Sequence, residues 1–152
     1  MNKVIIYIKS IAIPVLIGVI VGLITSSFMD YSTLQKPFLA PPNIVFPIVW
    51  TILYTLMGIS YGILESNNLA DEDIDWIYYL QLGVNALWSI IFFVLKWRLF
   101  AFLWIILLAI LVISMIRKFY DRNKISGLLQ IPYILWIAFA SYLNLAFYIL
   151  NG

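Results

Sequence analysis

The sequence contains neither cysteine nor histidine. Disulfide bridges, thiolate nucleophiles and metal sites built on these side chains are therefore excluded. Catalytic groups that pair serine or cysteine with a histidine base are excluded with them, and a haem iron would lack its commonest axial ligands. We therefore expect no metal site and no resident cofactor.

Charged residues are scarce, because they make up 11% of the 152 residues whereas 64% are hydrophobic. Soluble domains carry about a quarter charged residues, so lipid rather than water must cover most of this surface. The formal net charge is only +2, and no Lys/Arg run with interleaved aromatic residues suggests nucleic-acid binding. The composition predicts an integral membrane protein surrounded by membrane lipid.

Long apolar runs separate the few charged clusters. A helix that crosses a bilayer needs about 20 apolar residues, and a backbone in lipid must satisfy its own hydrogen bonds. The runs lack the polar–apolar alternation of strands in a membrane barrel. We therefore expect one domain, residues 1–152, with an all-α fold of five transmembrane helices at roughly 4–27, 44–64, 76–95, 99–117 and 126–150.

The connections between these runs differ in character. The first, residues 28–43, is the longest and contains Pro37, Pro41 and Pro42, which bar a regular helix. A loop of this length often acts as a lid over a site. An acidic second loop is expected at residues 65–75, and a polar fourth loop at residues 118–124.

Lys and Arg are distributed unequally between the two expected membrane faces. An excess of these residues marks the cytoplasmic side. The sequence therefore predicts a multi-pass protein of the cell membrane with a cytoplasmic N-terminus and an external C-terminus. Six lie on the N-terminal face and three on the other: Lys3, Lys9, Arg117, Lys118, Arg122 and Lys124 against Lys36, Lys96 and Arg98.

No ionisable Asp, Glu, Lys or Arg falls in the middle of a predicted helix. Ion-coupled transport needs such groups as relays, and acid–base catalysis needs paired carboxylates, so the sequence argues against both. Aromatic residues instead make up 17% of the chain. Trp76, Tyr78, Tyr79 and Trp97 stand at helix ends, where aromatic rings favour the membrane interface.

Other aromatic residues repeat at helical spacing inside three predicted helices, and residues three or four apart share a helix face. Such stripes arise from ordinary helix packing or from a binding pocket. Asn85 and Asn144 each need a polar partner, as the lining of a pocket for a flat apolar ligand or as interhelical bonds. The stripes are Trp50, Tyr54, Met57 and Tyr61, then Asn85, Trp88 and Phe92, then Tyr133, Trp136, Ala140 and Asn144.

Two small residues, Gly18 and Gly22, lie one turn apart in the first predicted helix. Such a pair lets another helix approach closely. Close packing within one chain and a homodimer are equally compatible with this spacing.

Several blocks of sequence resemble the TspO/MBR family, the tryptophan-rich sensory proteins related to the mitochondrial translocator protein (peripheral benzodiazepine receptor). The blocks occur in the family's order over almost the whole chain. They are residues 34–37 (LQKP), 41–42 (PP), 45–54 (VFPIVWTILY), 85–89 (NALWS) with 92–93 (FF), 132–136 (PYILW), 139–140 (FA) and 142–144 (YLN).

The resemblance implies a five-helix bundle, often a homodimer, with a pocket closed by the first loop. It implies ligands such as protoporphyrin IX or a related tetrapyrrole, and drugs of the benzodiazepine site. The pocket residues implied by position are Tyr31, Pro41, Pro42, Trp50, Tyr54, Asn85, Trp88, Phe92, Trp136 and Ala140.

The sequence departs from the family pattern in three places. Asp30 and Leu39 stand where the family often has tryptophan, which changes how the first loop would hold a ligand. Only residues 149–152 follow Tyr148, and they include no Lys or Arg, so the animal cholesterol motif is missing.

Four functions compete for this sequence. The leading hypothesis is a receptor or sensor that binds a tetrapyrrole in an aromatic pocket. The resemblance also implies an enzyme that degrades protoporphyrin with light and oxygen, in which Trp50 and Trp136 would be the reactive pair. A translocator of porphyrins and a purely structural membrane subunit are the remaining alternatives.

Overall fold

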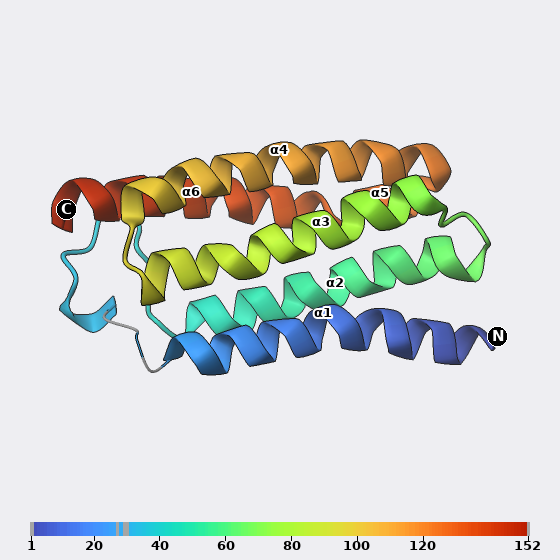
Figure 1. Cartoon of the computed structure of the whole chain (residues 1–152), viewed down its shortest axis with the longest axis horizontal. Helices are drawn as coiled ribbons and strands as arrows, with labels where there is room; N and C mark the ends of the chain where they lie inside the picture. The colour runs from blue at the N-terminus through green and yellow to red at the C-terminus, as the bar shows by residue number, and fades with distance from the viewer. Residues whose placement is uncertain (1, 27, 29–30, 152) are drawn as a thin grey trace.

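The computed structural model describes residues 2–26, 28 and 31–151, with the side chain of Ser32 excepted; Asp30 lies outside these residues. All regular structure in them is helical, and five helices are long and apolar enough to cross a membrane, which confirms the predicted fold (Figure 1). The elements are α1 (Lys3–Ser26), η1 (Tyr31–Thr33), α2 (Val45–Ser66), α3 (Glu72–Ser89), the π-helical η2 (Ile90–Val94), α4 (Arg98–Arg122), α5 (Lys124–Leu128) and α6 (Ile131–Asn151).

Helix ends on the N-terminal side of the bundle differ from the predicted ones. Helix α3 begins at Glu72, four residues early, because the Asp71 carboxylate caps it by accepting a hydrogen bond from the Ile74 amide at 3.1 Å. Helix α4 continues to Arg122, so the predicted loop 118–124 shrinks to Asn123, which caps the short helix α5. The predicted fifth helix is therefore two helices, α5 and α6, in one membrane span.

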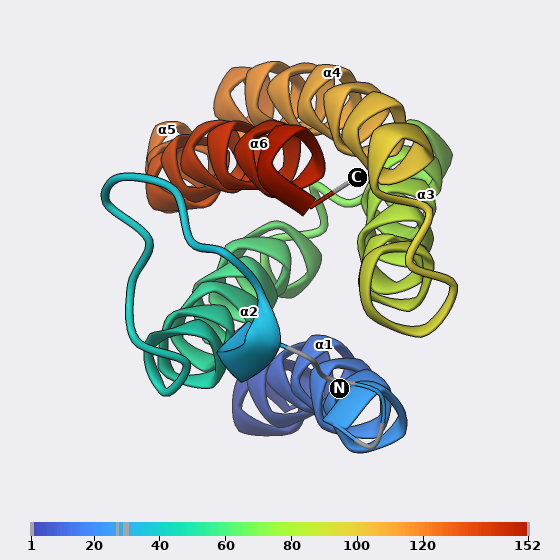
Figure 2. The same cartoon turned by 90° about the vertical axis from the view of Figure 1, so that its left-hand side faces the viewer.

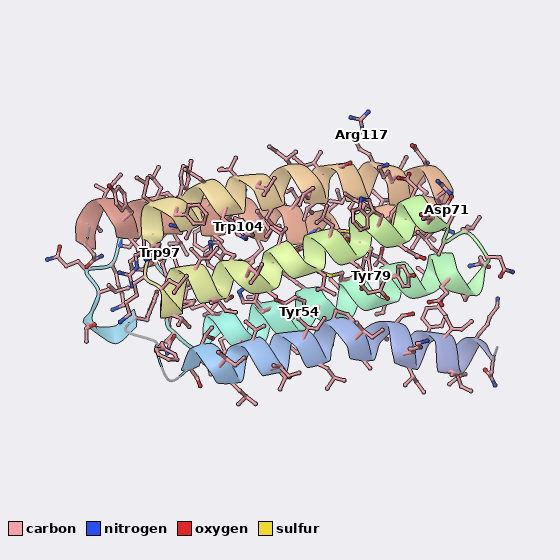
Figure 3. All side chains as sticks on the ribbon, in the orientation of Figure 1. Tyr54, Asp71, Tyr79, Trp97, Trp104 and Arg117 are labelled. Atoms are coloured by element: carbon pink, nitrogen blue, oxygen red, sulfur yellow. The ribbon has the colours of Figure 1, made fainter. Side chains whose placement is uncertain are left out.

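The extension of α4 brings basic side chains to the acidic start of α3. Arg122 contacts Asp71 at 2.6 Å, and Lys118 contacts Asp73 at 2.8 Å. The bond from Arg122 lowers the pKa of the Asp71 carboxyl. Arg117 instead points away from the bundle, whereas Asp71 lies at the end where α2 meets α3 (Figure 3). The acidic second loop thus serves largely as the capped and paired start of a helix.

Glycines allow the first half of α1 and the second half of α2 to pack closely, at the end of the bundle that carries the N-terminus. A Cβ atom on Gly58 would lie 2.5 Å from the Ile11 Cα, and one on Gly62 would lie 2.8 Å from the Tyr7 ring. Pro14 lies inside α1, which continues through it. The two helices diverge toward the opposite end, where the first loop arches from η1 past the end of α6 to the start of α2 (Figure 2).

The termini lie at opposite ends of the bundle (Figure 1). The core is continuous between α2, α3, α4 and α6, whereas α1 leaves most of its surface exposed. The Trp104 indole donates a hydrogen bond to the Val84 carbonyl at 2.8 Å and so joins α4 to α3. Four helices therefore form a packed unit, and α1 lies against one side of it.

We expect Gly58→Ala to destabilise the protein by about 1–3 kcal/mol, because the added methyl group would overlap the backbone of α1. Gly83→Ala is the matched control, since a Cβ there meets no neighbouring heavy atom within 4 Å among the described residues. Thermal unfolding in detergent measures both variants. Equal midpoints for the two variants would contradict the close approach of α1 and α2.

Candidate functional site

A cavity of about 640 Å³ lies between α1, α2, α6 and the junction of α3 with η2, beneath the first loop. Small-molecule sites are mostly apolar clefts of about 300–1,000 Å³, and this cavity falls in that range. Its walls are mainly aromatic and aliphatic. The rings that line it are Tyr31, Phe46, Trp50, Tyr54, Trp88, Phe92, Phe93, Trp136 and Phe147.

The rings present flat faces in two directions. Trp50 stacks on Tyr54 with ring centroids 5.6 Å apart, and Trp136 stands perpendicular to Trp50 at 6.4 Å. On the opposite wall, Trp88 stacks on Phe92 at 5.3 Å. This arrangement suits a broad planar ligand, because aromatic faces favour offset-stacked and edge-to-face contacts.

The first loop closes the cavity on the side of the C-terminus. Tyr31 is 4% exposed, its ring packs edge-on against Phe46 and Phe147, and its hydroxyl donates to the Pro41 carbonyl. Outside the cavity, the Gln35 backbone N–H donates to the side-chain oxygen of Asn151 at 2.9 Å. The Asn151 side-chain amide donates to the Gln35 backbone carbonyl at 3.0 Å. These bonds attach the loop to the end of α6.

A buried chain of hydrogen bonds, which we call the polar chain, connects α2, α3 and α6 below the cavity. The Tyr54 hydroxyl donates to the side-chain oxygen of Asn85 at 2.6 Å, and the Asn85 side-chain NH2 donates to the Tyr133 hydroxyl at 2.7 Å. The Tyr133 hydroxyl donates onward to the Gln81 side chain at 2.7 Å. Both ends of the Asn85 amide are therefore used between helices.

Asn144 is also engaged between elements, although it lines the cavity. Its side-chain oxygen accepts from the Trp88 indole N–H at 3.0 Å, and its side-chain NH2 donates to the Arg98 backbone carbonyl at 2.7 Å. These bonds hold α6 against the end of α3 and the start of α4. The sequence left open whether Asn85 and Asn144 line a pocket or form interhelical bonds. In the structure both side chains form bonds between helices.

Seven of the ten residues expected at a ligand site line this one cavity: Tyr31, Trp50, Tyr54, Trp88, Phe92, Trp136 and Ala140. Asn85 is 2% exposed and lies behind Tyr54. Pro41 and Pro42 belong to the loop above and are not part of the lining.

The residues expected from the sequence did not include the cavity wall formed by α1. They also did not include three lining phenylalanines, Phe46, Phe93 and Phe147. Phe46 lies one turn before Trp50 and could have been added to that stripe, whereas Phe147 lies beyond the residues that the third stripe covered. The position at the membrane–water interface that was expected for Tyr78 is wrong, because this ring is 1% exposed and stacks on Tyr61 with ring centroids 4.5 Å apart.

The two glycines of α1 lie on the side of the helix that meets α2 and the cavity, although Gly22 is also exposed. A Cβ on Gly18 would lie 2.5 Å from the Tyr54 ring, and Gly22 lines the cavity. The close approach at Gly18 is thus within one chain, between α1 and α2.

We expect Asn85→Ala to destabilise the protein by about 1–3 kcal/mol, because it leaves the hydroxyls of Tyr54 and Tyr133 without their partner in an apolar interior. Tyr54→Phe, which removes one donor and keeps the ring, should cost less. Denaturant unfolding in detergent compares them. An Asn85→Ala variant as stable as the parent would show that the polar chain does not hold the helices.

Comparison with known proteins agrees with this architecture. The sequence profile of the TspO/MBR family matches residues 10–150. The chain is 45% identical to the tryptophan-rich protein TspO of Archaeoglobus fulgidus, with 80% of each chain covered. It is 36% identical to protein CrtK of Rhodobacter capsulatus, covering 86% of this chain and 83% of the relative, and 30% identical to the translocator protein of Sus scrofa, covering 75% and 70%. The chain is therefore a multi-pass membrane protein that belongs to the TspO/MBR family.

Proposed function

We propose that this protein is a membrane receptor or sensor that binds a tetrapyrrole such as protoporphyrin IX in the aromatic cavity. The observation that carries the proposal is a cavity of about 640 Å³ whose walls are mainly aromatic and aliphatic, with indole rings on three of its helices. Burial of apolar area contributes about 25 cal/mol per Å², so a large flat ring gains affinity here without a charged partner. Drugs of the benzodiazepine site, also aromatic, belong to the same proposal.

One charged group near the cavity supports a ligand with carboxylate oxygens. At the loop, the Lys36 ammonium lies 4.9 Å from the centre of the Tyr31 ring, which lines the cavity. Lys36 is therefore the proposed partner for a porphyrin propionate.

The charge asymmetry supports an orientation with the N-terminus in the cytoplasm. The six Lys and Arg residues counted above belong to the end of the bundle that carries the N-terminus (Figure 1). In this orientation the cavity and its loop lie in the outer half of the membrane.

Titration of purified protein with protoporphyrin IX in the dark should quench tryptophan fluorescence saturably. Trp136→Ala should weaken binding about tenfold or more, because loss of the buried indole surface removes about 1.4 kcal/mol or more. Trp97→Ala is the matched control, since Trp97 is 58% exposed and outside the cavity. Linear quenching without saturation would mean partitioning into the micelle and would refute the receptor.

The perpendicular pair of Trp50 and Trp136 favours a second candidate, an enzyme that degrades protoporphyrin with light and oxygen. Both rings line the cavity with centroids 6.4 Å apart, so a bound porphyrin would contact both. The excited ring would take an electron from an indole and pass it to molecular oxygen as superoxide, and the indole radical left behind would attack the ring. In the parent, illumination in air should then destroy bound porphyrin faster than free porphyrin.

The double variant Trp50→Phe/Trp136→Phe separates this enzyme from a receptor. Phenylalanine keeps an aromatic surface but is much harder to oxidise than indole. Light-driven loss of the porphyrin absorbance should fall to the protein-free rate if the two tryptophans react. An unchanged rate at equal occupancy would remove them from any chemistry.

Transport is the third candidate, since the relative from Sus scrofa is called a translocator protein. The described helices carry no ionisable relay across the membrane interior, so any movement of ligand would be passive. The cavity serves this function as well as it serves a receptor.

A further inference from the structure

The cavity has an opening in its side wall, between the diverging halves of α1 and α2. Val19, Gly22 and Leu23 on α1 line the cavity, as do Pro47 and Thr51 on α2, and all five are exposed on the bundle's outer surface. We call these five residues the window. A residue that lines a cavity and also faces the surroundings marks a place where the wall is one side chain thick or absent.

The packing of α1 explains where the window lies. Gly58 and Gly18 hold the two helices in contact, with added Cβ atoms 2.5 Å from Ile11 and from Tyr54. One turn beyond Gly18, an added Cβ on Gly22 meets no neighbouring heavy atom within 4 Å among the described residues. Val19 and Leu23 are 52% and 69% exposed. An added Cβ thus meets α2 at Gly18 but no described neighbour at Gly22, and the window begins between these two positions.

In the window, and at its neighbours Thr25 and Ser26, the described side chains present no free hydroxyl to lipid. The Thr51 hydroxyl donates to the Pro47 carbonyl at 2.7 Å, and the Thr25 hydroxyl donates to the Gly22 carbonyl at 3.3 Å. The Ser26 hydroxyl likewise donates to a carbonyl of its own helix at 2.9 Å. Because these groups are already bonded, an apolar molecule can pass them without stripping hydrogen bonds.

The first loop lies over the aqueous side of the cavity. Tyr31 is almost fully buried over it, and the first loop is tied to α6 through Gln35 and Asn151 and through the Tyr142 hydroxyl, which donates to the Phe38 carbonyl at 2.5 Å. A ligand that displaced this loop from the aqueous side would have to break these bonds. One arriving from the bilayer meets an apolar opening.

We infer that the cavity is filled from the bilayer, through the window, and therefore takes ligands that first dissolve in lipid. The inference rests on the proposed function, since it concerns the same cavity. It restricts the ligand to molecules that partition strongly into membranes and gives α1 the role of an entrance wall.

The test uses full-length protein in phosphatidylcholine vesicles, with protoporphyrin IX as the probe and tryptophan quenching followed by stopped flow in the dark. Gly22→Phe places a ring in the window and should slow association by about tenfold or more, as an obstructed route does. Dissociation should slow as well, because the ligand leaves by the same route. Gly83→Phe, at the other unobstructed glycine on the outer surface, should leave both rates unchanged.

A reversible plug separates obstruction from misfolding. The chain has no cysteine, so Leu23→Cys introduces one thiol that a benzyl thiosulfonate converts to a bulky mixed disulfide. Association should slow after modification and recover when dithiothreitol removes the group. Leu103→Cys, on a residue of α4 that is 60% exposed, is the matched control and should not respond.

Three results would overturn the inference in distinguishable ways. Saturable binding with rates unaffected by either plug would reject the window and leave the receptor intact. Faster association in Asn151→Ala, with no effect of the plugs, would place entry at the loop. Absence of saturable quenching in the parent protein would refute the proposed function itself, and the window with it.

Discussion

The polar chain is the interaction on which the rest of the structure depends. No water is present inside a bilayer to satisfy the hydroxyl of Tyr54 or that of Tyr133, so both must find a partner in the protein, and Asn85 provides it. Trp50 lies one turn from Tyr54, and Trp136 lies three residues from Tyr133. Helices held in register by the chain therefore bring their tryptophans to one common space, and the cavity is a consequence of that register.

Helix α1 is held differently, and the difference explains the asymmetry of the cavity. It has few polar bonds to the other helices and packs through glycines, which allow close approach only where they occur. Past Gly18 the helices separate, and the fourth wall of the cavity is incomplete. The same molecule thus combines three helices fixed by directional hydrogen bonds with one helix that leaves an opening to lipid.

The sequence predicted the five spans and most of the cavity rings, because both follow from periodicity. Runs of apolar residues define spans, and residues three or four apart define faces. It could not assign Asn85, since an amide in an apolar helix fits a ligand site and an interhelical bond equally well until its neighbours are known. Nor could it place the wall formed by α1, whose apolar residues surround the helix and mark no face. The early start of α3 depended on a cap by Asp71, and the long α4 on basic residues that pair with that acidic start.

We propose that the ligand binds in the space between the polar-chain helices and the diverging half of α1. Photo-cross-linking with a tetrapyrrole that carries a diazirine, followed by mass spectrometry, tests it most directly. Cross-links should fall on residues 18–23 of α1, 50–54 of α2 and 136–140 of α6, and excess unlabelled protoporphyrin IX should abolish them. Cross-links confined to the lipid-facing surface of α4, at residues 103–110, would contradict the claim and place binding outside the bundle.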